Sequence, residues 1–275
     1  MVVMTGFLLI PWFELRPWPI ALPFGASITL QPFGVLAAIA LLVCHHFAAV
    51  RAEQLSICRK LLADFLTRVT LVGIISAYVL NIAMYLPDQW SEIAARPSLL
   101  VTRWYGLSSY GGFIGGALAA CHFTYTRRAS LVKLGDIWCF SFPFAWFFAR
   151  MGCFCVHDHP GVVSDFALAV ADWKGSGLAR HDLGLYEVLW SVPVALWFWW
   201  ARRRYLVPGV YLGLLCAAYG PVRFALDFLR ASDLQGGDIR YAGLTPAQYL
   251  SLALTLFGIV YSLRLPTRVT SEPAR

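Results

Sequence analysis

Charged residues are scarce in this sequence. Only 13% of its 275 residues are Asp, Glu, Lys or Arg, whereas 59% are hydrophobic and 15% are aromatic. A soluble domain is typically about 25% charged, so this chain cannot cover an apolar core of its size with a polar surface. The composition therefore excludes an ordinary soluble globular protein and predicts an all-α protein that crosses a membrane several times.

A disulfide framework is also lacking. Seven cysteines make an odd number, and their spacing is irregular, which does not fit a set of paired cysteines. Most lie in or beside apolar segments, where a free thiol packs like a small hydrophobic side chain. The net charge of +7 comes without a basic–aromatic pattern typical of RNA binding. We therefore attribute this charge to membrane topology and expect no nucleic-acid partner.

Apolar stretches near the length that crosses a bilayer, about 20 residues, are abundant. Seven of them are predicted to be transmembrane helices, and the fourth and fifth are expected to be the shortest. No soluble domain fits between them, so residues 1–275 are predicted to form a single membrane-embedded domain. The expected spans are 27–50, 65–86, 107–126, 134–150, 185–201, 209–229 and 247–265.

Basic residues are distributed unevenly over the connections between these spans. If the N-terminus lies outside, thirteen of the 22 basic residues but only four of the 15 acids fall inside. An excess of Lys and Arg marks the cytoplasmic side, so the pattern predicts an N-out, C-in topology with residues 150–161 at the outer face. The inside basic residues are Arg51, Arg59, Lys60, Arg68, Arg127, Arg128, Lys133, Arg202, Arg203, Arg204, Arg264, Arg268 and Arg275.

The stretch RMGCFCVHDHPG at 150–161 gathers polar groups directly after an apolar run. Cys153, Cys155, His157 and His159 alternate at every second residue, and an extended strand would place all four on one side. Zinc binds Cys and His, but its usual spacings are C-x(2–4)-C and H-x(3–5)-H. The pattern therefore does not predict a metal site, and the two cysteines are expected to pack at a helix end.

The sixth span contains ionisable residues, which are costly in a membrane and usually face a cavity or a partner. Tyr219, Arg223 and Asp227 are spaced by four and share one helix face, with Arg230 one turn beyond. Two readings remain open: a structural ion pair between Arg223 and Asp227, or a lipid phosphate facing Arg223, whose planar fork suits phosphate. Arg150 ends the fourth span on the same side, either as a snorkelling helix-end residue or as a second anion ligand.

The third span begins with GLSSYGGFIGG at 106–116. Its glycines allow a neighbouring helix or a ligand to approach the backbone closely, and helix packing alone accounts for such a pattern. Ser108, Ser109 and Tyr110 add hydroxyl groups beside the glycines. They are candidates for lining a polar pocket.

These motifs occur in an order that resembles the prolipoprotein diacylglyceryl transferase family, and the resemblance covers nearly the whole chain. It implies a seven-span transferase of the bacterial inner membrane that acts in lipoprotein biosynthesis, with its site at the periplasmic face. Such an enzyme moves a diacylglyceryl group from phosphatidylglycerol to the lipobox cysteine of a prolipoprotein signal peptide, forms a thioether and releases glycerol phosphate. No cofactor is expected. The matching stretches are 31–43, GLSSYGGFIGG (106–116), RMGCFCVHDHPG (150–161), RHDLGLYE (180–187), YGPVRFALDFLR (219–230) and LTPAQYLS (244–251).

The resemblance also implies which side chains act in such a reaction. The acceptor thiol must lose its proton, because the thiolate is the nucleophile, and fixed cations stabilise the charge that develops on the departing phosphate. The candidate catalytic residues are Arg150, Asp158, Arg223, Asp227, His157, His159 and Tyr110. The candidate phosphatidylglycerol-binding residues are Arg150, Gly111, Gly112, Gly161, Tyr219 and Arg223.

Many members of the family have a histidine, a proposed base, at the position of Tyr110. We therefore hypothesise that a loop histidine, one of His157, His159 and His181, replaces this base and that Asp158 orients it. Two alternatives stay open: a homologue that binds lipid or signal peptides without catalysis, and a lipid-binding or transport protein. Transporters often show internal repeats, and the two halves of this chain show no convincing similarity.

Overall fold

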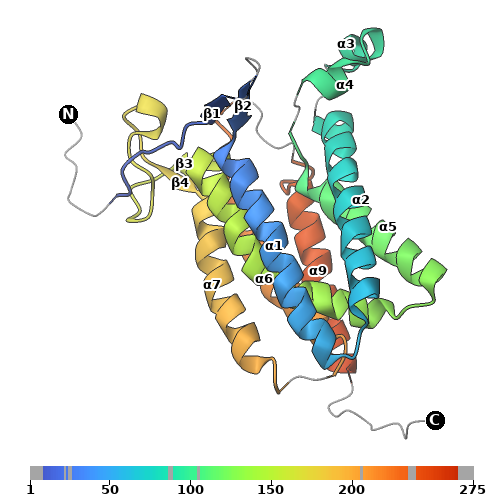
Figure 1. The fold of residues 1–275 in the computed structure, drawn as a ribbon. Coiled ribbons are helices and arrows are strands. Elements are labelled where there is room, and N and C mark those ends of the chain that lie inside the picture. The colour runs from blue at the N-terminus through green and yellow to red at the C-terminus, as the bar shows by residue number, and fades with distance from the viewer. Residues whose placement is uncertain are drawn as a thin grey trace, which may run out of the picture. The chain divides into compact units, whose positions relative to one another are not determined.

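The computed structural model describes residues 9–21, 23, 27–85, 89–103, 106–204, 207–234 and 240–265. The chain forms long helices with two short antiparallel hairpins (Figure 1), in which β1 (Trp18–Ala21) pairs with β2 (Ser27–Leu30) and β3 (Pro160–Val163) pairs with β4 (Arg180–Asp182). Two 3-10 helices, η3 (Trp173–Gly175) and η4 (Asp227–Leu229), are also present. The α-helices are α1 (Pro32–Gln54), α2 (Arg59–Tyr85), α3 (Trp90–Ala95), α4 (Leu99–Thr102), α5 (Ser109–Arg127), α6 (Leu131–Val156), α7 (Leu183–Ala201), α8 (Val210–Leu226) and α9 (Pro246–Arg264).

Seven of the helices overlap the seven expected apolar stretches, with bounds that differ by up to six residues. In the described part of the chain, five are long and apolar enough to cross a membrane: α1, α2, α6, α8 continued by η4, and α9. The other two, α5 and α7, are 19 residues long. Outward-facing leucines on α1, α7 and α9 (Leu42, Leu196 and Leu256) are 63–71% exposed, as expected where lipid rather than water surrounds the protein. The expectation of an all-α, multi-pass membrane protein is confirmed.

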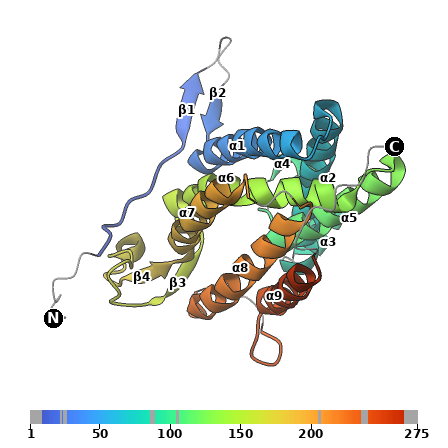
Figure 2. The same cartoon turned by 90° about the horizontal axis from the view of Figure 1, so that it is seen from below.

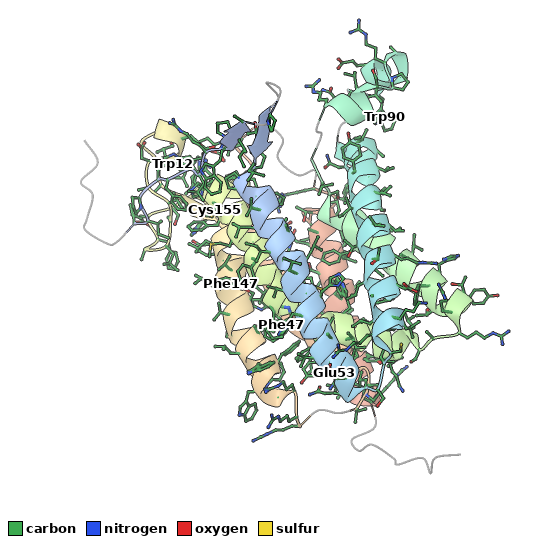
Figure 3. The ribbon with its side chains drawn as sticks, in the orientation of Figure 1. Trp12, Phe47, Glu53, Trp90, Phe147 and Cys155 are labelled. Carbon is green, nitrogen blue, oxygen red and sulfur yellow. The ribbon has the colours of Figure 1, made fainter. Side chains whose placement is uncertain are left out.

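The chain divides into two compact units, and the first combines Met1–Arg51 with Trp138–Arg275. In this unit α8 packs closely along α9 (Figure 2). Glycines make this approach possible, since a Cβ atom added to Gly258 would lie 2.4 Å from the backbone nitrogen of Ala217. On the other side of the unit, Phe47 of α1 (Figure 3) stacks on Phe144 of α6 with ring centroids 3.7 Å apart.

The second unit, Ala52–Ile137, is organised by the packing of α2 against α5. A Cβ atom added to Gly111 would lie 2.5 Å from the carbonyl oxygen of Ser76, so this glycine is required for the contact. Gly112 is less constrained, because its nearest neighbour would be the Cβ atom of Ala77 at 3.8 Å. Ser108 caps α5 by accepting a hydrogen bond from the backbone nitrogen of Gly111. The glycine-rich stretch therefore packs two helices together.

The helix that contains the fourth expected span is longer than that span. We expected residues 134–150 and one of the shortest spans, but α6 has 26 residues and continues to Val156. The apolar side chains after residue 150 keep packing, as Phe154 does against Phe13. The helix ends where His157 adopts a left-handed backbone conformation (φ 48°). Cys153 and Cys155 therefore lie in a helix, not in the extended strand that would align them with the histidines.

Candidate active site

Glu187, near the beginning of α7, is the centre of a buried polar site. Its Oε2 atom accepts hydrogen bonds from Trp146 Nε1 (2.8 Å), Arg150 Nε (3.0 Å) and Tyr219 Oη (3.2 Å). Figure 2 shows α6, α7 and α8, which carry these groups, near one another. A buried charge is costly unless it is paired and hydrogen-bonded. The three contacts to one carboxylate oxygen explain how Glu187 and Arg150 are both held in the protein interior.

Arg223 of α8 approaches the same carboxylate from the other side. Its Nη2 atom pairs with Asp227 Oδ1 at 3.2 Å, so the ion pair of the first of the two readings is present along the helix. Its Nη1 atom lies 3.9 Å from Glu187 Oε1, which is too long for a hydrogen bond. Arg223 Nη1 and Glu187 Oε1 are both buried and have no hydrogen-bond partner among the described residues. The guanidinium of Arg223 therefore has unused donor capacity beside Glu187.

Asp227 fixes the position of Arg223 at the end of α8. Its Oδ1 atom also pairs with Arg230 Nε at 3.1 Å, and its Oδ2 atom accepts a hydrogen bond from the hydroxyl of Thr245. Thr245 is the N-cap of α9 and forms a reciprocal capping box with Gln248. Asp227 thus connects the end of α8 to the start of α9. The stretch LTPAQYLS therefore helps to fix the position of Asp227, and through it that of Arg223.

Asp158 and His159 follow α6 and extend the site. His159 Nε2 lies 3.1 Å from Arg150 Nη1, and its Nδ1 atom is hydrogen-bonded to Asp158 Oδ1. An arginine nitrogen only donates, so His159 Nε2 is assigned as the acceptor and Nδ1 as the protonated atom that donates to Asp158. Asp158 is 43% exposed, so its carboxylate is only partly desolvated. This desolvation raises its pKa, but the hydrogen bond to His159 and the positive charge of Arg150 outweigh it and hold the pKa below its usual range.

Cys153 belongs to this site and is not only a packing residue. Arg150 Nη1 donates to its sulfur atom at 3.6 Å. Among the described residues, Cys153, Asp158 and His159 form a group of three possible metal ligands, with their ligand atoms within 4.8 Å of one another. The guanidinium of Arg150 already uses lone pairs of the sulfur and the imidazole. A metal cation would have to compete with this positive charge, whereas an anion would be attracted to it.

His157 lies in a different environment. Its ring is 1% exposed and stacks on Trp12 with centroids 4.5 Å apart, while Trp173 packs edge-on at 5.2 Å. Figure 3 shows Trp12 beside the loops of the β3–β4 region. His157 Nδ1 contacts Asp182 Oδ2 at 2.7 Å, and the other carboxylate oxygen caps α7 through the backbone nitrogen of Leu185. This arrangement gives His157 a structural position between the N-terminal segment and α7.

His181 and Gly161 position the β3–β4 hairpin. The ring of His181 is hydrogen-bonded to the hydroxyl of Tyr186, and burial lowers the pKa of this histidine. A Cβ atom added to Gly161 would lie 2.6 Å from the Cβ atom of His181 and 2.7 Å from the carbonyl oxygen of Leu229. Gly161 therefore allows β3 to lie directly against β4 and against the end of η4.

Arg180 links the β3–β4 hairpin to the segment that follows η4. Its Nη1 atom donates to the carbonyl oxygen of Gly161 at 3.1 Å and to Asp233 Oδ1 at 3.0 Å, while Nη2 bonds to Asp233 Oδ2. This bidentate pair lowers the pKa of Asp233. Sequence reasoning assigned Arg180 no role, and its only signal was its place in the stretch RHDLGLYE.

The predicted residues divide between the two units. Sequence reasoning placed Glu187 at the correct end of its helix but assigned it no role; an acid at the start of an apolar span was the available signal. Gly111 and Gly112 belong to the second unit, as does Tyr110, whose side chain lies outside the described residues. The predicted residues that the first unit brings into one network are Arg150, Asp158, His159, Tyr219, Arg223 and Asp227.

The fold and the site together define a multi-pass α-helical membrane protein with a buried, arginine-containing site where several helices end. The profile of the prolipoprotein diacylglyceryl transferase family matches residues 19–264. The chain belongs to this family.

Individual relatives carry the same name. The phosphatidylglycerol–prolipoprotein diacylglyceryl transferase of Chromohalobacter salexigens is 29% identical over 254 residues, which cover 90% of this chain and 93% of that protein. The transferase of Rhodospirillum rubrum is 33% identical over 178 residues, or 62% of this chain and 64% of the relative. That of Erythrobacter litoralis is 31% identical over 193 residues, or 64% and 68%.

Proposed function

We propose that this protein transfers the diacylglyceryl group of phosphatidylglycerol to the lipobox cysteine of prolipoprotein signal peptides. The names of its relatives supply both substrates. One observation in the chain itself carries the proposal: a single buried carboxylate, Glu187, holds Arg150 and lies 3.9 Å from Arg223, whose Nη1 atom has no hydrogen-bond partner among the described residues. Two guanidinium groups with spare donor capacity fit a phosphate diester.

The reaction requires little covalent chemistry from the protein. The acceptor sulfur attacks the glycerol carbon that bears the phosphate; the S–C bond forms, the C–O bond breaks, and glycerol phosphate leaves with the electron pair. Arg150 and Arg223 stabilise the charge that develops on this leaving group, as fixed donors do for other anionic transition states. Their positions are held before the reaction by Glu187 and Asp227, so little reorganisation is needed.

His159 is the proposed base. Its Nδ1 proton is used in the hydrogen bond to Asp158, so Nε2 carries the lone pair that accepts the thiol proton. Arg150 Nη1 lies 3.1 Å from Nε2 and occupies this lone pair. When the Nη1 end of Arg150 shifts to the phosphate while Nε stays on Glu187, His159 Nε2 is released to the incoming thiol. This sequence couples binding of the lipid donor to activation of the acceptor.

We further propose that the chain crosses the inner membrane seven times, with its N-terminus outside and its C-terminus inside, as one domain whose site faces the periplasm. The charge pattern supports this orientation, because Arg51 and Arg264 lie in the last turns of α1 and α9, and Arg202–Arg204 directly follow α7. Glu187 and Asp227 lie at the other ends of the helices, with the site. The family profile runs through both compact units, which supports a single functional domain.

The test is a transfer assay in proteoliposomes that contain labelled phosphatidylglycerol and a lipobox peptide, with the thioether product identified by mass spectrometry. Lysine at position 150 keeps the charge but loses the planar fork, so we expect R150K to lose about 100-fold or more in turnover, the usual cost of removing a positioned donor. R96K alters an exposed arginine and serves as the matched control. Lipid binding without transfer by folded wild-type protein would instead identify a non-catalytic lipid-binding homologue.

A further inference from the structure

The end of α7 that is distant from Glu187 carries a cluster of tryptophans and arginines, within the sequence WFWWARRR at 197–204. The guanidinium carbon of Arg202 lies 3.4 Å from the ring centroid of Trp199, and that of Arg204 lies 3.9 Å from the ring centroid of Trp200. Both tryptophans are exposed, as is Arg203 between the two stacked arginines. We call these five residues the α7 cluster.

The stacking gives the α7 cluster a defined geometry. A guanidinium whose carbon lies over an aromatic ring contacts the ring face and keeps N–H donors on the side away from it. Arg202 also donates to the carbonyl oxygen of Trp199, one of the carbonyls at the helix end. Positive charge is favourable at this end of a helix, because the helix dipole is negative there. The rings of Trp199 and Trp200 therefore hold Arg202 and Arg204 in place, and their remaining N–H groups stay available as donors.

The neighbouring helices add positive charge at the same end of the first unit. The guanidinium of Arg51, at the end of α1, lies 4.8 Å from the ring centroid of Tyr211 at the start of α8. The hydroxyl of Tyr211 donates to the carbonyl oxygen of Phe198 in the last turn of α7. The described acids of this unit lie toward the other helix ends. They are found in the N-terminal segment, between residues 158 and 187, and between residues 227 and 233.

The length of α7 places the α7 cluster one membrane thickness from the hairpin side of the site. The 19 residues of Leu183–Ala201 correspond to about 28 Å of helix, close to the hydrocarbon thickness of a bilayer, about 30 Å. Figure 1 shows the β3–β4 hairpin at one end of α7 and the opposite end well away from it. Tryptophan is typical of the membrane–water interface, and Leu196, one turn before Trp200, is 65% exposed on the lipid-facing surface.

We propose that the α7 cluster binds the headgroup phosphate of an anionic phospholipid in the leaflet opposite the active site. The stacked guanidinium groups of Arg202 and Arg204 donate to the phosphate oxygens, Arg203 adds charge, and Leu196 lies along the acyl chains. The proposal depends on α7 crossing the bilayer but not on the transferase reaction. It therefore survives if the protein proves not to transfer diacylglyceryl groups.

The experiment measures retention of phosphatidylserine by native mass spectrometry, because this anionic lipid lacks the headgroup of the proposed donor. Each arginine near an anionic surface contributes about 1 kcal/mol, so R202Q/R203Q/R204Q is expected to weaken retention about 100-fold. Phosphatidylcholine is the neutral control lipid, and an unchanged melting temperature of the variant shows that it is folded. Equal retention of phosphatidylserine by this variant and the wild type would overturn the proposal.

A second variant separates a built site from a diffuse positive charge. R202K/R203K/R204K keeps the charge but loses the stacked planar fork, and we expect it to bind phosphatidylserine more weakly than the wild type. Equal binding by the lysine variant would show that positive charge alone attracts the lipid, and this would contradict the proposed geometry. If free glycerol phosphate displaced bound phosphatidylserine as effectively as unlabelled phosphatidylserine does, the acyl chains would contribute nothing to binding. That result would contradict a lipid as the ligand of the α7 cluster.

Discussion

Glu187 and Arg150 form a hydrogen-bonded ion pair, with Oε2 and Nε 3.0 Å apart and side chains that are only 1% and 5% exposed. The same carboxylate has Arg223 on its other side. Without it, two guanidinium groups would lie near each other in a poorly solvated site. Glu187 thus permits a double positive site to exist before the phosphate arrives.

Replacing Glu187 by Gln keeps the shape of the side chain and removes its charge. We expect E187Q to lose at least about 100-fold in transfer, because Arg150 and Arg223 are no longer held apart and in place. Breaking a buried ion pair on one side typically costs on the order of 3–5 kcal/mol, so the melting temperature is also expected to fall. E53Q removes an exposed pair with Arg59, worth at most about 1 kcal/mol, and is the control. Wild-type turnover in E187Q would refute the proposed role.

The two neighbouring histidines are expected to respond differently to substitution. H159Q removes the proposed base, which typically contributes about 100- to 10,000-fold to the rate, and it is expected to leave the melting temperature close to that of the wild type. H157Q disturbs the packing against Trp12 and the contact with Asp182, so it is expected to lower stability but to keep most of the turnover. Turnover and melting temperature measured on both variants decide the assignment, which must be reversed if H157Q alone abolishes transfer by folded protein.

Asp158 is expected to make stability depend on pH in the acid range. The hydrogen bond to His159 and the charge of Arg150 hold its pKa below the usual value despite partial desolvation, so the folded state binds its proton less readily than the unfolded chain. The resulting stabilisation is fully present above the unfolded-state pKa, about 4, and is lost as the pH falls through the folded-state pKa. Thermal melts of the wild type and D158N between pH 6 and pH 3 test this. Curves that stay parallel through this range would contradict it.

Two adjacent glycines provide a matched pair for the contact between α2 and α5. A methyl group at Gly111 would lie 2.5 Å from the carbonyl oxygen of Ser76, whereas one at Gly112 finds its nearest atom at 3.8 Å. We expect G111A to destabilise the protein by about 1–3 kcal/mol, the usual cost of overpacking, and G112A to be tolerated. Comparable melting temperatures for the two variants would show that the helices separate at little cost.

The apolar runs predicted the helices well because burial in lipid dictates composition along a whole span. They could not predict where α6 ends, since Met, Cys and Phe after residue 150 are compatible with either helix or loop. Its end depends on the left-handed turn at His157 and on the tertiary packing of Phe154 against Phe13. The hairpin β3–β4 was likewise not predicted. It is held by the hydrogen bond from Arg180 to the carbonyl oxygen of Gly161 and shows no alternation of apolar and polar residues.

The site was predicted less completely than the fold. Spacing by four identified the pair of Arg223 and Asp227, since a helix places such residues on one face. Contacts between helices carry no such signal, so the central position of Glu187 between α6 and α8 could be found only in three dimensions. The same is true of the histidines: His157 and His159 are two residues apart, yet one is enclosed by aromatic rings and the other contacts Arg150.

The length of α7 has a consequence for the choice of membrane. In the proposed topology, α7 joins Glu187 to Arg202 over fifteen residues, or about 22 Å of rise, so the depth of the site is tied to the level of the opposite headgroups. A thicker bilayer must thin locally or draw one of these polar ends into hydrocarbon, at a cost for every ångström of mismatch. The turnover of the enzyme should therefore depend on the acyl-chain length of the surrounding lipids. It should pass through a maximum as these chains are lengthened.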